Sequence, residues 1–268
     1  MENTEKLASR ARENALRMVH RAKASHIGSA LSVVDILAVL YGQVLVKNPA
    51  NPNWQQRDRF ILSKGHACAA VYAILALVGY YPVAKLESYG DDNSWLMNHI
   101  SHHVPGVEFS TGSLGHGLPF AVGKALAAKK KTECWRTFVL VSDGEMGEGS
   151  NWEGLLFAGH HQLNNLTIII DYNNLQSLGT VDETLRLAPL AKKIEAFGCA
   201  TIEIDGHDHS ELKKALTIVN KSKPTVIIAH TIKGKGVGFM ENRIEWHYKN
   251  PNDEELLRAL TELGLNNA

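Results

Sequence analysis

The sequence predicts an α/β domain built on a parallel sheet. Four short segments rich in valine and isoleucine indicate buried strands: 137–141, 166–170, 201–204 and 225–229. Segments with helical spacing alternate with them, which is typical of βαβ units joined by right-handed crossovers. At 268 residues the chain has the length of one large or two small domains, and no linker, repeat or low-complexity tract divides it. We therefore expect a single domain.

The remaining elements follow from apolar spacing and from turn and capping residues. A short apolar run at 59–62 predicts a further strand, which leads into a turn at 63–66. Ser32 is interpreted as the N-cap of a helix that ends before Pro49. Helices are expected over 7–23, 33–46, 67–79, about 152–163, 190–197, 210–220 and 253–263.

Composition and charge exclude several classes of protein. Lys and Arg together number 28, as do Asp and Glu, so the chain lacks the basic surplus of a nucleic-acid-binding protein. The longest apolar run, 69–78, is too short to span a membrane, which takes about 20 residues. The polar residues 1–5 do not resemble a signal peptide, so we expect a cytoplasmic protein. Widely spaced Cys68, Cys134 and Cys199 indicate reduced thiols rather than a disulfide framework or a zinc site.

Histidine is the unusual component of the sequence. The chain has 13 histidines, about twice the share of an average soluble protein. No His-Glu-x-x-His motif is present, so zinc is a poor interpretation of them. His160 and His161 fall inside a predicted helix and are interpreted as packing or surface residues. His207 and His209 are interpreted as turn residues near a helix start.

Two polar residues follow neighbouring strands of the predicted sheet. Asp143 comes after the strand at 137–141, and Asn173 comes thirty positions later, after the strand at 166–170. One strand–helix–strand unit puts both at the carboxyl ends of adjacent strands, where ligands bind in such sheets. A carboxylate, an amide oxygen and a backbone carbonyl are hard ligands that suit magnesium carrying a diphosphate. An Asp-Gly pair after a strand is also common in turns that bind nothing, so the pair alone leaves both interpretations open.

Five ordered motifs resemble those of transketolases, and together they cover nearly the whole chain. They lie at 24–29, 57–67, 105–115, 143–149 with 173–175, and 231–236 with 246–247. The fourth reads Asp-Gly-Glu-Met-Gly-Glu-Gly, followed by Asn-Asn-Leu thirty residues after the aspartate, and is similar to the family's thiamine diphosphate motif. The chain departs from the family pattern at Ile27, Gly28 and His116, and none of these changes removes a group that the chemistry needs.

The resemblance implies a fold, a cofactor and a metal. The fold is the thiamine-diphosphate-binding fold, a mostly parallel sheet flanked by helices on both faces, with residues 1–268 forming one diphosphate-binding domain. Mg²⁺ (or Ca²⁺) would be held by the Asp143 carboxylate, the Asn173 amide oxygen and the Leu175 carbonyl. The implied cofactor-binding residues are His66, Gly112, Leu114, Gly144, Glu145, Asn173 and Lys233.

The resemblance also implies a substrate channel lined by histidines. The matching residues are His26, His66, His99 and His247, with Ser29 a weaker candidate. An imidazole has an ordinary pKa near 6.5, so it can donate or accept a proton at neutral pH and can hydrogen-bond a developing oxyanion. These four histidines are the expected catalytic residues.

Transketolases are transferases of carbohydrate metabolism that move a two-carbon ketol unit between sugar phosphates. The resemblance covers only the N-terminal, diphosphate-binding part of that family. The pyrimidine-binding and C-terminal domains are therefore expected on a partner chain, and this chain is expected to be the N-terminal subunit of a split transketolase. It would be active only with its partner, in a heterotetramer. Glu148 matches a glutamate at the family's subunit contact and is assigned to the interface.

Three alternatives stay open at this point. The chain could belong to a deoxyxylulose-phosphate synthase-like enzyme or to a 2-oxo acid decarboxylating one, and the four channel histidines favour transketolase over both. It could also be a non-catalytic thiamine-diphosphate-binding module, which the retained metal ligands and histidines make a poorer interpretation. The sequence does not reveal the donor sugar, the acceptor sugar or the pathway.

Overall fold

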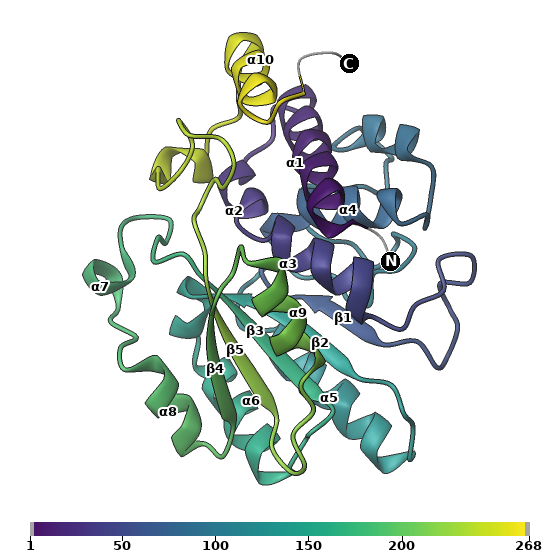
Figure 1. The fold of residues 1–268 in the computed structure, drawn as a ribbon, viewed down its shortest axis with the longest axis vertical. Coiled ribbons are helices and arrows are strands. Elements are labelled where there is room, and N and C mark those ends of the chain that lie inside the picture. Colours follow the sequence, from purple (N-terminus) through teal and green to yellow (C-terminus); the bar gives the residue numbers. More distant parts are fainter. Residues whose placement is uncertain (1–2, 266–268) are drawn as a thin grey trace.

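The computed structural model describes residues 3–265, which form a five-stranded sheet with helices around it (Figure 1). The strands are β1 (Arg59–Leu62), β2 (Thr137–Ser142), β3 (Leu166–Tyr172), β4 (Ala200–Asp205) and β5 (Thr225–His230). They are arranged in the order β1-β2-β3-β5-β4, and every neighbouring pair is parallel. The parallel α/β sheet and all five expected strands are therefore confirmed.

Both faces of the sheet are covered, which explains the continuous apolar runs of its central strands. Alternate side chains of β2 enter two separate cores, with Phe138 and Leu140 in one and Val139 and Val141 in the other. Successive side chains of a strand point to opposite faces, so a strand covered on both sides needs apolar residues throughout. Only β4, at the edge, is largely half-buried or exposed.

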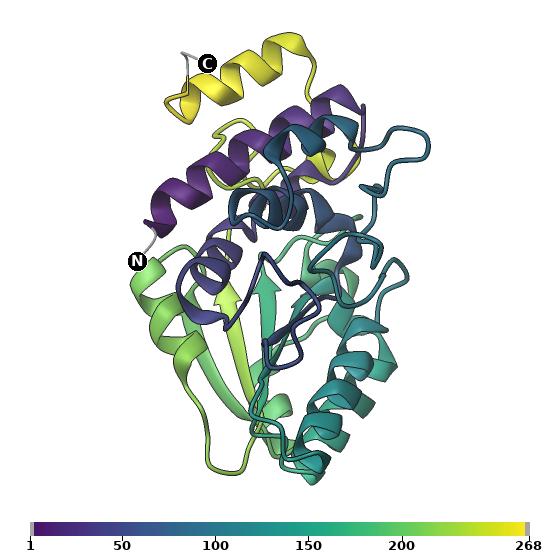
Figure 2. The same cartoon turned by 90° about the vertical axis from the view of Figure 1, so that its right-hand side faces the viewer.

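Helices of different segments cover the two faces (Figure 2). The core that holds Val139 also contains residues of α5 (Gly117–Lys130), α6 (Gly149–His160) and α8 (Leu190–Ala196). The other core contains residues of α3 (Val34–Val39) and α9 (His209–Thr217).

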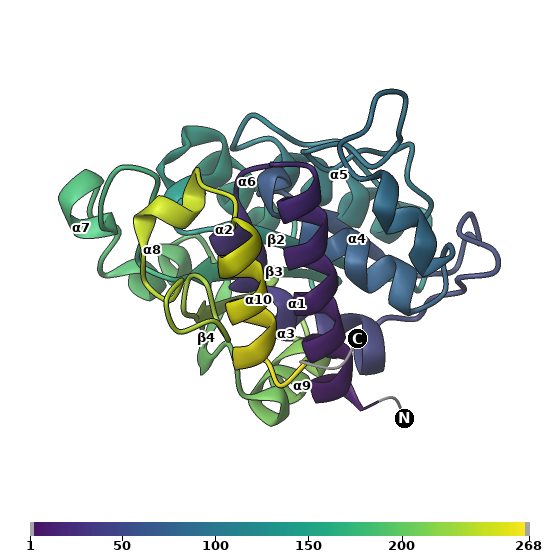
Figure 3. The ribbon, with the colours of Figure 1, turned by 90° about the horizontal axis from the view of Figure 1, so that it is seen from above.

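A further helical layer lies beyond the carboxyl ends of the strands, toward which the arrowheads point in Figure 2. It consists of α1 (Thr4–Arg21), α2 (Ile27–Leu31), α4 (Cys68–Leu77) and α10 (Asp253–Glu262). Figure 3 shows α1, α2 and α10 from above, over the strand ends. A site at that edge of the sheet is therefore enclosed between strand ends below and helices above.

Several short elements complete the described chain. They are a π-helix at Leu40–Val44, α7 (Val181–Thr184), and 3₁₀-helices at Gly65–Ala67, Val83–Ser88, Gly144–Gly147 and Ile244–His247. The three cysteines are free thiols, as expected. Within residues 3–265, no helix has the length and apolar character needed to cross a membrane.

The expected helix over 33–46 is wrong in its start and its continuity. The segment instead contains the end of a turn, then α3, then the π-helix. Ser32 is the C-cap of α2 and not an N-cap. Its single hydroxyl proton is shared between two acceptors, the Ser29 carbonyl (3.0 Å) and Asp171 Oδ2 (2.8 Å). The side chain of Ser32 bonds a distant strand rather than the amides of a following helix. The local sequence does not indicate which of these partners the side chain takes.

The helix α5 has no counterpart in the sequence-based expectations. It carries Pro119 in its first turn, where a missing N–H leaves no intrahelical bond unmade, and Gly123 in its interior. Proline and glycine both disfavour a helix prediction. The buried positions nevertheless have a clear helical spacing, namely Leu118, Ala121, Val122 and Ala125. That spacing, with two lysines in the last turn, is the signal that identifies the helix.

The packing predicts a large difference between two isoleucines. Ile168 in β3 is fully buried, whereas the side chain of Ile218 after α9 is 41% exposed. Ile168→Ala should lower the free energy of unfolding by about 2–5 kcal/mol because it leaves a cavity between two packed layers. Ile218→Ala is the matched control and should cost less than about 1 kcal/mol. Urea unfolding followed by circular dichroism measures both, and equal losses would contradict the described core.

Candidate active site

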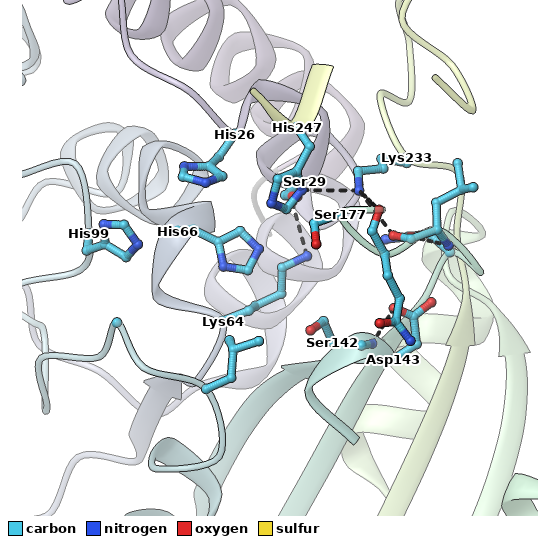
Figure 4. Close-up of a pocket in the computed structure, with 16 residues that line it drawn as sticks. His26, Ser29, Lys64, His66, His99, Ser142, Asp143, Ser177, Lys233 and His247 are labelled. Atoms are coloured by element: carbon cyan, nitrogen blue, oxygen red, sulfur yellow. Dashed lines mark hydrogen bonds between the residues drawn. The ribbon is translucent and has the colours of Figure 1, made fainter. Parts of the chain in front are cut away.

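A cleft lies between the carboxyl ends of the strands and the helical layer (Figure 4). Nearly all of the residues predicted from the sequence line it: His26, His66, His99, Gly112, Leu114, Asp143, Gly144, Asn173, Leu175, Lys233 and His247. Ser29, the weaker candidate, lines it too. The sequence analysis missed Lys64, Ser142, Gln176 and Ser177, which are also in the lining. All four lie within or beside quoted motifs, and that proximity is the signal that could have found them.

The floor of the cleft contains a fully buried ion pair. Lys64 follows β1 and its Nζ lies 2.5 Å from Oδ2 of Asp171 in β3, with both side chains at most 1% exposed. Asp171 also accepts hydrogen bonds from Ser32 Oγ, from Thr231 Oγ1 and from Asn173 Nδ2. Burial alone raises the pKa of Asp171, but the Lys64 charge and these donors outweigh it and lower the pKa. Asp171 is therefore ionised and accepts hydrogen bonds from four donors.

Asp143 is a buried carboxylate whose partners are backbone amides. Its oxygens accept hydrogen bonds from Gly144 N (2.6 Å) and Asn174 N (2.6 Å), and the residue is 2% exposed. Among the described residues no Lys, Arg or His forms an ion pair with it. Burial, and then the charge of Asp171, raise the pKa of Asp143 to about 6. A cation bound here would relieve that unfavourable environment.

Two further oxygens complete the predicted ligand set. The amide nitrogen of Asn173 donates to Asp171 (3.1 Å), which fixes the orientation of the amide, and its Oδ1 accepts from Leu175 N (3.1 Å). The Leu175 carbonyl already accepts a hydrogen bond from the ammonium of Lys233 (3.1 Å). A carboxylate, an amide oxygen and a carbonyl in one lining suit a hard divalent cation, so the residues present fit the predicted metal.

Lys233 brings a second buried ammonium to the cleft. It follows β5, is 1% exposed, and lies 3.3 Å from both the Gln176 carbonyl and His247 Nδ1. Burial, and then the nearby Lys64 charge, lower the pKa of Lys233 to about 8. Because Lys64 is already paired with Asp171, Lys233 is the buried ammonium that an anionic ligand in the cleft would compensate.

The four predicted histidines form one cluster. The ring centroid of His26 lies 5.1 Å from that of His66, 5.7 Å from that of His99 and 4.9 Å from that of His247. They come from separate places in the chain, namely the start of α2, the turn after β1, the 90–104 loop and the 3₁₀-helix before α10. Gly65 permits this arrangement because a Cβ there would lie 2.3 Å from the Thr111 carbonyl oxygen.

Burial keeps these imidazoles uncharged at neutral pH. It lowers the pKa of His26 to about 4, with His99 and the two lysines adding to the effect, and that of His247 to about 3, with Lys233 adding to it. The pKa of His66 is lowered well below 6.5 by burial and then by Lys64, and that of His99 is lowered by burial. Each ring therefore offers one N–H donor and one nitrogen acceptor.

Two glutamates predicted for the site lie outside the cleft lining. The Glu145 carboxylate is buried beneath the 112–117 loop and accepts hydrogen bonds from Ser63 Oγ (2.5 Å) and Gly115 N (2.9 Å). Glu145 is not among the residues that line the cleft, so any contact with a cofactor would be indirect, through that loop. Glu148 is exposed on the surface beside Gly115. His160 ends α6 on the surface, as expected.

Comparison with known proteins gives a consistent result. The family model described as "Transketolase, thiamine diphosphate binding domain" matches residues 3–268. The chain is 46% identical over 240 residues to one of the subunits of the apulose-4-phosphate transketolase of Actinobacillus succinogenes, covering 89% of this chain and 87% of the relative. It is 37% identical over 255 residues to a 6-deoxy-6-sulfo-D-fructose transketolase subunit of a Clostridium species, covering 94% of this chain and 93% of the relative.

Solved structures agree with the sequence comparison. The transketolase of Campylobacter jejuni superimposes with a TM-score of 0.93 at 34% sequence identity, and that of Leishmania mexicana with a TM-score of 0.91 at 32%. Each comparison covers 98% of this chain but only 43% and 42% of those transketolases, so this chain spans about two fifths of their length. The chain belongs to the transketolase family and corresponds to its thiamine diphosphate-binding domain.

Proposed function

We propose that the chain is the diphosphate-binding subunit of a two-chain transketolase that uses thiamine diphosphate and Mg²⁺ (or Ca²⁺). One observation carries the proposal: a single cleft combines three hard oxygen ligands, two buried lysines and four neutral histidines. The oxygens suit a divalent cation, Lys233 suits a diphosphate, and the histidines suit a polyhydroxylated substrate that loses and regains protons.

The metal and the diphosphate would be bound by residues from four strand ends. Asp143, Asn173 Oδ1 and the Leu175 carbonyl would hold the cation, which neutralises the Asp143 charge. Lys233, with His66 and the Gly144 backbone, would face the diphosphate, while Gly112 and Leu114 would lie against the cofactor rings. When bound, thiamine diphosphate supplies the ylide and the electron sink for breaking a carbon–carbon bond.

The histidine cluster would handle the substrate's protons. The ammonium of Lys233 can only donate, so His247 Nδ1 accepts from it and His247 Nε2 carries the ring proton. His247 would then donate to a sugar oxygen. Neutral His26 and His99 would accept a hydroxyl proton and hydrogen-bond the oxyanion that develops. The low pKa values keep these acceptors available at neutral pH.

The substrate and partner are proposed from the relatives' names. Two relatives are named for a phosphorylated ketose and for a sulfonated ketose, and their names call them subunits. The chemistry common to both is a ketose with an anionic end, which we propose for this chain as well. The partner would carry the pyrimidine-binding domain, and exposed Glu148 would lie in the contact within a complex of two copies of each chain.

The metal site predicts the effect of changing Asp143. Asp143→Ala should weaken Mg²⁺-dependent binding of thiamine diphosphate by about 100-fold or more, because the cation loses its only protein carboxylate. Isothermal titration of the complex with its partner measures this affinity. Asp253→Ala, whose side chain is 97% exposed on α10, is the matched control and should bind normally. Undiminished affinity in Asp143→Ala would contradict the proposed metal site.

The histidine cluster predicts a separate phenotype. His26→Ala and His99→Ala should each lower turnover by about 10²-fold while leaving cofactor affinity nearly unchanged, because both rings are proposed to act on the sugar. Steady-state kinetics and cofactor titration separate the two effects. His20→Ala, a surface change on α1, should affect neither. The proposed roles are wrong if both cluster variants keep wild-type turnover.

The two-chain proposal predicts inactivity of the isolated chain. Purified alone with thiamine diphosphate, Mg²⁺ and a ketose–aldose pair, it should show no ketol transfer, and adding the partner should restore it. Light scattering of the mixture should give the mass of two copies of each chain, since a permanent complex of this kind buries about 2,000 Å² or more. Robust turnover without a second polypeptide would be incompatible with this assembly.

A further inference from the structure

A buried polar cluster lies outside the cleft, between α1, α3 and the start of α9. Asp35 accepts hydrogen bonds from Arg12 Nη2 (2.5 Å), His207 Nδ1 (2.7 Å) and His209 Nε2 (3.1 Å). The side chains of these four residues are between 7% and 17% exposed. His207 and His209 lie at the helix start that the sequence predicted, but no sequence pattern indicates their shared carboxylate. We call these four residues the Asp35 cluster.

Asp35 stays ionised in this environment. Burial by itself raises the pKa of Asp35, but the hydrogen bonds from the two histidines, together with the Arg12 charge, outweigh it and hold the pKa well below its ordinary value. The carboxylate can therefore accept from three donors at once. The cluster thereby connects α1, α3 and the loop that follows β4 through one carboxylate.

One arm of the cluster reaches the chain after β5. The backbone N–H of Ile232 donates to His207 Nε2 at 2.9 Å. Since that nitrogen is an acceptor, the ring proton of neutral His207 lies on Nδ1 and is donated to Asp35. His207 thus links the carboxylate of Asp35 to one particular backbone amide.

A second arm reaches the same segment three residues further on. Arg12 donates from Nη2 to Asp35 and from Nε to the Lys235 carbonyl, at 3.1 Å. The segment 232–235 is therefore held at its first amide and at its last carbonyl, and both holding side chains are fixed by the same carboxylate.

Lys233 lies between these two attachment points. Its neighbour Gly234 has a φ of +83°, and a Cβ there would lie 2.4 Å from the Met240 carbonyl oxygen, so this turn requires glycine. The ammonium of Lys233 reaches the Leu175 and Gln176 carbonyls, on the side of the cleft where the metal and diphosphate are proposed to bind. Moving either attachment point would displace that ammonium.

We propose that the Asp35 cluster positions Lys233. The cluster fixes the location of the Lys233 ammonium relative to the diphosphate and does not itself contact the cofactor. The inference rests on the proposed function, because it takes Lys233 as a diphosphate ligand. His207 and Arg12 act through the backbone of 232–235, whereas His209 shares the carboxylate but bonds Thr4 Oγ1 (2.7 Å) and not that segment. This difference supplies a matched control within the cluster.

The test compares His207→Asn with His209→Asn. His207→Asn can keep a donor toward Asp35 in place of Nδ1 but loses the acceptor of the Ile232 amide. His209→Asn can keep a group near Thr4 but loses the Nε2 donor to Asp35, so it removes one hydrogen bond of the cluster without touching the segment 232–235. We expect both variants to lose similar thermal stability. In hydrogen–deuterium exchange of the full chain, the amide hydrogens of 231–236 should exchange faster than in the wild type only in His207→Asn. In the complex with its partner and Mg²⁺, only His207→Asn should weaken thiamine diphosphate binding, by about tenfold, with turnover at saturating cofactor largely retained.

His207→Gln tests whether the acceptor itself matters. Its amide oxygen can replace Nε2 as acceptor, so protection of 231–236 and cofactor affinity should return toward wild type. If His207→Asn and His209→Asn change exchange and affinity equally, or His207→Asn changes neither, the inference is overturned. Lys233→Met separates the proposed diphosphate contact of Lys233 from the proposed positioning role of the Asp35 cluster. If it binds the cofactor normally, the proposed diphosphate contact fails, and if it is impaired while His207→Asn is not, only the positioning role fails.

Discussion

The buried ion pair between Lys64 and Asp171 is the interaction on which the arrangement of the site depends. Two charges at this depth are stable only if their remaining hydrogen-bonding capacity is satisfied, because desolvation of each ion is costly. Asp171 meets that requirement with donors from four segments: the chain after β1, α2, the end of β3 and the chain after β5. These segments cannot shift independently without leaving a buried charge unpaired.

The same requirement shapes the chemistry of the cleft. Lys64 is committed to Asp171 and so cannot neutralise Asp143, whose carboxylate is left with backbone amides and a raised pKa. Lys64 and Lys233 also add to burial in lowering the pKa values of the histidines above them. The cleft thus holds a carboxylate without a cationic partner, a buried ammonium and uncharged imidazole rings, and this distribution of charge supports the proposed binding of a divalent cation with a diphosphate. That distribution of charge agrees with the family to which the chain belongs.

Two buried carboxylates hold the chain after β5 from different sides. Asp171 bonds Thr231 from within the sheet, and Asp35 in α3 holds 232–235 through His207 and through Arg12 in α1. The positively charged side chain of Lys233 follows directly from this doubly held segment. The helices α1 and α3, which contribute little to the cleft lining, thereby contribute to its geometry.

Local pattern was sufficient for much of this protein. Apolar runs determined β1, β2, β3 and β5, because strands buried on both faces need apolar residues throughout. The edge strand β4 is largely half-buried or exposed, and it was predicted from a Thr-Ile-Glu-Ile segment between two expected helices. Parallel order then placed Asp143 and Asn173 at adjacent strand ends, and the resemblance to transketolases, with three of the four histidines inside its motifs and His99 outside them, marked the histidines that the fold gathers. Predictions from periodicity failed where Pro119 and Gly123 masked α5, although its buried positions carry the helical spacing.

Only the tertiary structure decided which partner each polar side chain takes. Ser32 has the sequence context of an N-cap but bonds Asp171, 139 residues away in the chain. Glu145 belongs to the cofactor motif, yet its carboxylate supports the 112–117 loop from below. Nothing near Asp35 in sequence indicates His207, 172 residues further on. Spacing along the chain encodes which face of an element is apolar, whereas a hydrogen bond between distant elements depends on how those elements pack, and that is settled by the whole fold.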